Sequence, residues 1–210
     1  MKARYLQIFA WTISILAVVL AVVAWGQDNR WQLTGLSFYQ VFPVFGLLAF
    51  SLMWAHYAMS ALRQYLKLDT TVLRNYFEIT SLMVLAAILL HPGLLAWQLW
   101  RDGLGLPPGS EINYVSPSMG IYVVIAMVSL LIFLAYELRR MYGNRPWWKY
   151  VQYASDVAIF LILIHSLKLG SQLQVGWLRP IWYFYGITLA ISLAYTYLLK
   201  YQNRQKTVVK

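Results

Sequence analysis

The fold is decided by long apolar stretches, of which residues 77–100, FEITSLMVLAAILLHPGLLAWQLW, are representative. This stretch has one charged residue, Glu78, near its start. Its length matches the roughly 20 apolar residues with which an α-helix crosses a bilayer core. Five further stretches are of the same kind, so the sequence predicts an all-α integral membrane protein, a single domain of residues 1–210 built as a six-helix bundle. The predicted spans are about Tyr5–Trp25, Tyr39–Leu62, Phe77–Trp100, Met119–Leu138, Tyr150–Gln172 and Ile181–Tyr201.

The composition agrees with this class, since 60% of the residues are hydrophobic and 11% are charged. The first stretch follows Met1-Lys2-Ala3-Arg4 and resembles a signal peptide. Its apolar core is too long, however, and no clear cleavage site of small residues precedes Gln27. We therefore expect it to be a retained helix.

The net charge of +10 follows the predicted topology. With the N-terminus in the cytoplasm, thirteen of the seventeen Lys and Arg residues fall on the cytoplasmic side. This bias predicts a multi-pass protein of the cell inner (plasma) membrane with both termini cytoplasmic. The basic excess therefore indicates contact with anionic lipid and makes nucleic acid an improbable partner. The four basic residues on the opposite side are Arg30, Arg101, Lys168 and Arg179.

Two of the three histidines lie inside apolar stretches at matching depths. His91 and His165 each stand 14 or 15 residues into a helix that runs outward, or about 21 Å from the inner edge at 1.5 Å per residue. Two neutral imidazoles at one level on two parallel helices are what bis-histidine ligation of a heme iron requires. A histidine that only hydrogen-bonds a neighbouring helix is the alternative for either residue alone.

The absence of cysteine excludes disulfides, thiolate-bound metal and covalently attached heme. A small ion would need a third protein ligand, whereas heme supplies four ligands itself. We therefore predict one b-type heme in the outer half of the membrane, with His91 and His165 as iron ligands. Three outer cations are available for its propionates, namely Arg101, Lys168 and Arg179, although each is also an ordinary interfacial charge.

A second group of ionisable residues is predicted near the inner surface. His56, Glu78 and Asp156 reach similar inner depths on the second, third and fifth stretches. Ionisable groups inside a membrane often mark a pathway, so these residues are candidates for a quinone, FMN or proton site. Hydrated charges paired with nearby arginines are the equal alternative.

The residues around the two histidines carry a family resemblance. Arg74 precedes the third stretch, residues 86–90 (AAILL) lead to His91, and residues 148–152 (WKYVQ) begin the stretch that reaches His165. This pattern resembles the ferric-reductase-like transmembrane domain, and within it the MsrQ/YedZ-type heme-binding membrane subunits of periplasmic methionine sulfoxide reductase systems. The resemblance covers the six-helix core. It implies b-type heme and electron transfer from a cytoplasmic or quinol-side donor to an extracytoplasmic redox partner.

The sequence also departs from that family. Relatives commonly carry a second histidine thirteen residues before the outer one, but Gln152 and Glu78 occupy those places here. The resemblance therefore implies a single outer heme. An electron crossing the inner half would then need a quinone or flavin there.

Two other functions stay open on the sequence alone. A proton- or ion-coupled transporter would use His56, Glu78 and Asp156, and a non-redox scaffold subunit would use its histidines only to bridge helices. No nucleotide-binding motif and no separate soluble domain is present in the sequence. An electron donor and an electron acceptor would therefore be other molecules.

Overall fold

The computed structural model describes residues 1–137 and 143–208, which are mainly helical and contain no strand. Six helices are long and apolar enough to span a membrane, which confirms the predicted fold class. Their spans are Lys2–Asp28 (α1), Phe38–Tyr65 (α2), Thr70–Arg101 (the 3₁₀ turn η1, Thr70–Leu73, followed by α3, Arg74–Arg101), Pro117–Tyr136 (most of α5, Gly120–Glu137), Trp148–Leu169 (α7) and Leu178–Gln205 (most of α8, Leu178–Val208).

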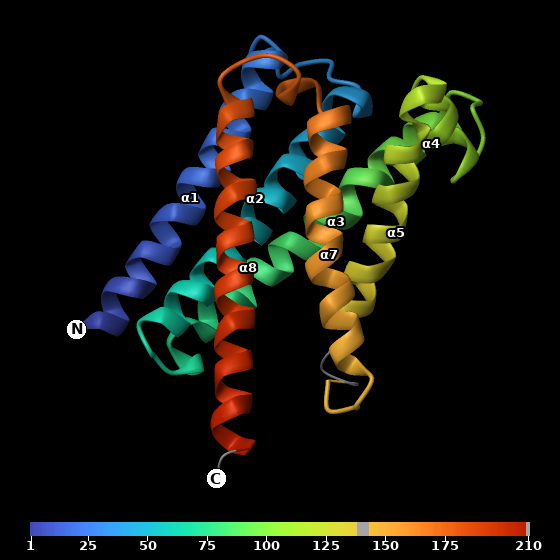
Figure 1. Cartoon of the computed structure of the whole chain (residues 1–210). Helices are drawn as coiled ribbons and strands as arrows, with labels where there is room; N and C mark the ends of the chain where they lie inside the picture. The colour runs from blue at the N-terminus through green and yellow to red at the C-terminus, as the bar shows by residue number, and fades with distance from the viewer. Residues whose placement is uncertain (138–142, 209–210) are drawn as a thin grey trace.

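The chain crosses the bundle up and down, so both termini lie toward the same end (Figure 1). We call this end the terminal side and the opposite end, which carries residues 29–37, 102–119 and 170–177, the loop side. In Figure 1, α7 and α8 stand nearly parallel, whereas α2 and α3 run obliquely behind them. Of the basic residues expected on the cytoplasmic side, Arg139, Arg140, Lys210 and the side chain of Lys206 lie outside the part described.

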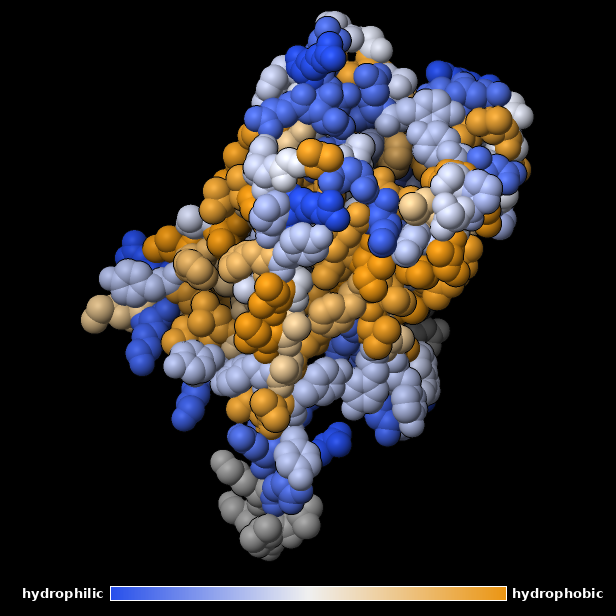
Figure 2. Space-filling model, turned by 45° about the horizontal axis from the view of Figure 1, so that its top comes forward, coloured by the Kyte–Doolittle hydropathy of each residue, from blue (hydrophilic) through white to orange (hydrophobic). Residues whose placement is uncertain are grey.

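The surface matches a lipid environment. On the face shown in Figure 2, a broad apolar band crosses the middle of the molecule, and hydrophilic residues gather above and below it. Large apolar side chains of the spanning helices, such as Leu82, Leu131 and Ile191, are more than 60% exposed. Such exposure would be costly in water but is favourable against acyl chains, so the protein is a multi-pass membrane protein.

Helix α1 packs on α2 through small residues. Ala10, Ser14, Ala17, Ala21 and Ala24 are buried and recur at steps of four and three, which places them on one face of α1. Small side chains let helix backbones approach closely, and in lipid this van der Waals contact drives helix association. α2 also contacts α3 and α8 and is the central helix of the bundle.

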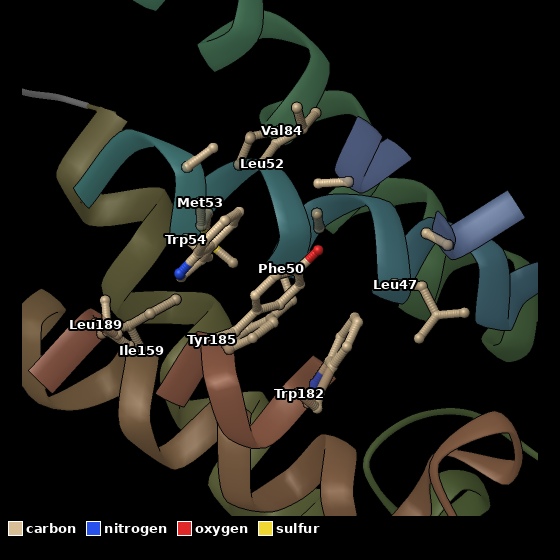
Figure 3. Packing of buried hydrophobic residues seen from close by; sticks show 14 of the residues in the cluster. Leu47, Phe50, Leu52, Met53, Trp54, Val84, Ile159, Trp182, Tyr185 and Leu189 are labelled. Carbon is tan, nitrogen blue, oxygen red and sulfur yellow. The ribbon is translucent and has the colours of Figure 1, made fainter. Parts of the chain in front are cut away.

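An aromatic cluster joins α2 to α8 (Figure 3). The rings of Trp54 and Tyr185 stack with centroids 4.0 Å apart, and those of Phe50 and Trp182 stack at 5.1 Å. The polar edges are satisfied inside the bundle, because Trp54 Nε1 donates to Thr188 Oγ1 at 2.7 Å. This cluster fixes α8 against α2 and leaves the α3 and α7 faces to form the site described next.

The long connection on the loop side is more ordered than its Gly and Pro content suggests. It contains the short helix α4 (Gly109–Tyr114) and the 3₁₀ turn η2 (Pro117–Met119). The ring of Tyr114 stacks on that of Tyr39 at 5.3 Å, nearly parallel. This contact holds the connection against the start of α2.

Candidate functional site

His91 lies on α3 and is fixed by the helix that packs beside it. Its Nδ1 lies 2.9 Å from the carbonyl oxygen of Phe42 on α2. Gly46, one turn further along α2, makes room for the imidazole, because a Cβ at that position would stand 2.8 Å from His91 Cε1. The ring therefore occupies a notch in α2 that only a glycine leaves open.

His165 lies on α7 and has an equivalent setting. Its Nδ1 lies 2.9 Å from the carbonyl oxygen of Tyr122 on α5. α5 and α7 are neighbours in the bundle, as α2 and α3 are. Each histidine is thus oriented by a backbone carbonyl from the antiparallel helix of its own hairpin.

These two hydrogen bonds determine which ring nitrogens are free. A carbonyl oxygen can only accept, so Nδ1 carries the proton and donates in both residues. A neutral imidazole with Nδ1 protonated keeps a lone pair on Nε2. Histidines that bind metals commonly donate the other ring N–H to a backbone carbonyl, which sets the tautomer and orients the ring. In both His91 and His165, Nδ1 donates to a backbone carbonyl and Nε2 keeps its lone pair.

The two imidazoles come together across the two hairpins. Their ring centroids are 6.5 Å apart and their planes are almost perpendicular, at 89°. A metal–imidazole nitrogen bond of about 2.0–2.1 Å, with roughly 1.1 Å from nitrogen to ring centre, would put two rings on opposite sides of one ion about 6.2–6.4 Å apart. The observed centroid separation is compatible with two imidazoles that would hold one iron between them. The residues present therefore fit a bis-histidine heme.

The three predicted outer cations have different surroundings. Lys168 follows His165 by one turn, and its Nζ lies 5.9 Å from the ring centre of Tyr122, whose carbonyl orients His165. Arg179 is tied to the loop, since its Nη1 donates to the Gln174 carbonyl at 2.8 Å. Arg101 is exposed beside Asp102, 3.9 Å away. Lys168 is therefore the cation most closely linked to the histidine pair.

His56 on α2 is hydrogen-bonded to a side chain of the neighbouring helix α3. Its Nε2 lies 2.6 Å from Thr80 Oγ1, and that hydroxyl donates its proton to the Tyr76 carbonyl, also at 2.6 Å. The Thr80 oxygen must therefore accept, so His56 Nε2 is the donor. This histidine bridges α2 and α3, well separated in sequence and setting from the His91 and His165 pair.

Asp156 forms a separate network inside the bundle. Its carboxylate accepts hydrogen bonds from Tyr57 on α2 at 3.0 Å and from Tyr197 on α8 at 2.5 Å. These two hydroxyl donors satisfy a polar side chain that would be costly to leave unbonded among the spanning helices. Glu78 is on the surface of α3 instead, 3.9 Å from Arg74 and 58% exposed. The structure thus puts His56, Glu78 and Asp156 in three environments and does not bring them together as one cluster.

Sequence reasoning missed the groups that orient these side chains. Phe42 and Tyr122 contribute backbone carbonyls. Every residue has such a carbonyl, so the residue type does not reveal this role. Gly46 is a visible signal, because a glycine in the middle of an apolar helix often permits a close approach. Over residues 1–137 and 143–208, no group of three or more His, Asp and Glu side chains could hold a metal ion.

Comparison with protein families, with curated proteins and with solved structures gives no match to this chain.

Proposed function

We propose that this protein is a membrane electron-transfer subunit that binds one b-type heme between His91 and His165. The observation that carries the proposal is the pairing itself: two imidazoles from different hairpins, 6.5 Å apart and perpendicular, each with Nδ1 committed to a carbonyl. When bound, heme supplies a one-electron Fe(III)/Fe(II) couple. The protein contributes the two nitrogen ligands and a dry environment.

The groups around the two histidines also contribute to the proposed heme site. The Phe42 and Tyr122 carbonyls hold the imidazoles in the tautomer that presents Nε2 and increase the basicity of that nitrogen. Gly46 lets His91 seat against α2. Lys168, and more remotely Arg101 and Arg179, supply positive charge for the propionates on the loop side.

The proposed direction of transfer depends on the expected topology and on the family resemblance. We infer that the terminal side is cytoplasmic, because the topology expected from the sequence assigns thirteen of the seventeen basic residues to the side that holds both termini, and that the membrane is the cell inner membrane. The histidine pair then lies nearer the outer face. Electrons would come from a quinol or flavin donor and leave to an extracytoplasmic acceptor, in keeping with the family that the sequence resembles.

The experiment is a reduced-minus-oxidised absorption spectrum of the purified full-length chain expressed with sufficient heme. The expected result is a b-type spectrum that His91→Ala and His165→Ala each abolish. His56→Ala is the matched control, because it removes the third histidine from a site bonded to Thr80 and should leave the bands intact. A spectrum unchanged in both His91→Ala and His165→Ala would overturn the proposal.

Proton-coupled transport is a second candidate, favoured by one observation. Asp156 is an ionisable group held by two tyrosines within the spanning helices, and such groups often mark proton pathways. This function predicts no chromophore and a proton-dependent flux in vesicles that Asp156→Asn abolishes. A b-type spectrum together with no such flux would reject it.

A further inference from the structure

A groove lies on the terminal side of the molecule, between α1 and the start of α3. It is an open surface groove with a volume of about 470 Å³. Its polar rim and apolar wall are formed by Arg4, Ile8 and Trp11 of α1 and by Thr71, Asn75 and Tyr76 from η1 and α3. We call it the Arg4 groove.

The walls of the Arg4 groove are fixed by contacts between its two sides. Gln7 Nε2 donates to the Val72 carbonyl at 2.8 Å. The rings of Trp11 and Tyr76 meet edge to face with centroids 5.3 Å apart, and the Tyr76 hydroxyl shares a hydrogen bond with Ser14 Oγ at 2.7 Å. These contacts between α1 and the start of α3 fix the shape of the groove without a bound ligand.

Among the described residues that line the groove, Arg4 is the charged one. None of its lining residues is acidic. Of the two carboxylates nearest in sequence, Asp69 borders the groove and accepts from the backbone N and Oγ1 of the lining residue Thr71, whereas Glu78 lies beside Arg74. Within the described part of the chain, Arg4 has no ion pair and no hydrogen bond to another side chain. An arginine without a protein partner at the edge of a spanning helix is free to bind an anion.

We propose that the Arg4 groove binds the phosphate of an anionic phospholipid. A guanidinium presents parallel N–H donors that match two phosphate oxygens, and the exposed amide of Asn75 supplies a further donor at the rim. The acyl chains would continue over the apolar face of α1, where Tyr5, Ile8 and Ile15 are 64%, 53% and 59% exposed. A groove of this size holds a head group, so the chains lie outside it. The proposal is independent of heme.

The test measures retained lipid by native mass spectrometry. The full-length chain is purified in micelles that contain equal amounts of phosphatidylglycerol and phosphatidylcholine with identical acyl chains. The expected result is one preferentially retained phosphatidylglycerol. Arg4→Gln should lower the ratio of bound phosphatidylglycerol to phosphatidylcholine about tenfold, since a charge-assisted pair is lost. Arg4→Lys should give an intermediate ratio, because lysine keeps the positive charge but lacks the parallel N–H donors of the guanidinium.

Lys67→Gln is the matched control, because it removes one exposed positive charge from the same side of the membrane but away from the groove. Asn75→Ala should lower the ratio by a smaller factor without a change of charge, and it keeps the test decisive if Arg4→Gln does not fold. Equal binding of the two lipids by the unmodified chain would overturn the proposal. So would an Arg4→Gln ratio equal to that of Lys67→Gln. A preference that excess inorganic phosphate removes completely would assign the groove to free phosphate and also overturn the lipid assignment.

Discussion

Gly46 of α2 lies directly against the imidazole of His91, so closely that a Cβ on Gly46 would stand 2.8 Å from Cε1 and 2.9 Å from Nδ1 of that ring. Both contacts are shorter than ordinary van der Waals distances. The ring, the Phe42 carbonyl to which it donates, and the backbone of α2 therefore form one rigid arrangement. The position of His91 is set by α2 as much as by α3.

Gly46→Ala is expected to displace His91. Crowding of a packed interior costs about 1–3 kcal/mol, and here the atoms that must move belong to a proposed iron ligand. We expect a lower unfolding temperature in detergent and a several-fold lower heme content per protein by absorbance. Gly93→Ala is the matched control, because it is on the same helix as His91 and a Cβ there meets nothing within 4 Å. Equal unfolding temperatures for the two variants would contradict the close contact.

Removing either tyrosine hydroxyl from Asp156 is expected to destabilise the bundle. Interhelical hydrogen bonds in membrane proteins contribute about 0.6 kcal/mol on average and up to about 1.7 kcal/mol. Tyr197→Phe should reach the upper part of that range, because its 2.5 Å contact is the shorter of the two, and Tyr57→Phe should cost less. The measurement is the free energy of unfolding in mixed micelles.

The control for these variants is Tyr153→Phe. Tyr153 lies on α7 with its ring 6.0 Å from that of Tyr197, but its hydroxyl is not part of the Asp156 network. A Tyr197→Phe cost no larger than that of Tyr153→Phe would show that the carboxylate contact contributes nothing. The double variant Tyr57→Phe/Tyr197→Phe should deviate from additivity, because both hydroxyls share one acceptor.

The loop side has a pH-dependent contact at Asp102. Hydrogen bonds from Gln98 Nε2 at 3.0 Å and from the Tyr39 hydroxyl at 2.8 Å hold the pKa of Asp102 below its ordinary value of 3.8. A carboxyl group with a lowered pKa in the folded state contributes stability above its unfolded pKa and loses it as the pH falls through the folded pKa. The stability that the unmodified chain has beyond that of the Asp102→Asn variant should therefore be constant near neutral pH and decline below about pH 4.

The measurement is the unfolding temperature as a function of pH. Gln98→Ala should reduce the pH dependence, because it removes the largest cause of the lowered pKa. Tyr39→Phe should reduce it less. A difference between the unmodified chain and Asp102→Asn that grows as the pH falls would have the wrong sign and would reject the assignment.

Hydropathy predicted the spanning helices well and their ends less well. The second stretch was expected at Tyr39–Leu62 and is helical over Phe38–Tyr65, and the last was expected at Ile181–Tyr201 and runs over Leu178–Val208. The difference has a physical cause, since hydropathy marks the part of a helix that meets lipid, whereas backbone hydrogen bonds continue into water. α4 was not predicted, because its six residues carry no periodic apolar pattern.

The histidine pair was predicted from depth alone, and the structure does bring the two rings together. Depth along a helix fixes only one coordinate, however. The rotation of each helix depends on packing, which explains why His56 and Asp156 were grouped although they face different partners. His56 and Tyr57 are adjacent on α2 and therefore point about 100° apart, one toward Thr80 and the other toward Asp156.

The separation of His91 and His165 between two hairpins has a consequence for biogenesis. His91 enters the membrane with the third spanning helix, whereas His165 arrives only with the fifth. Any ligand that needs both imidazoles therefore cannot be captured while the nascent chain has inserted only its first half. A ligand captured by both imidazoles would link the later hairpin to the earlier one and so stabilise the assembled bundle.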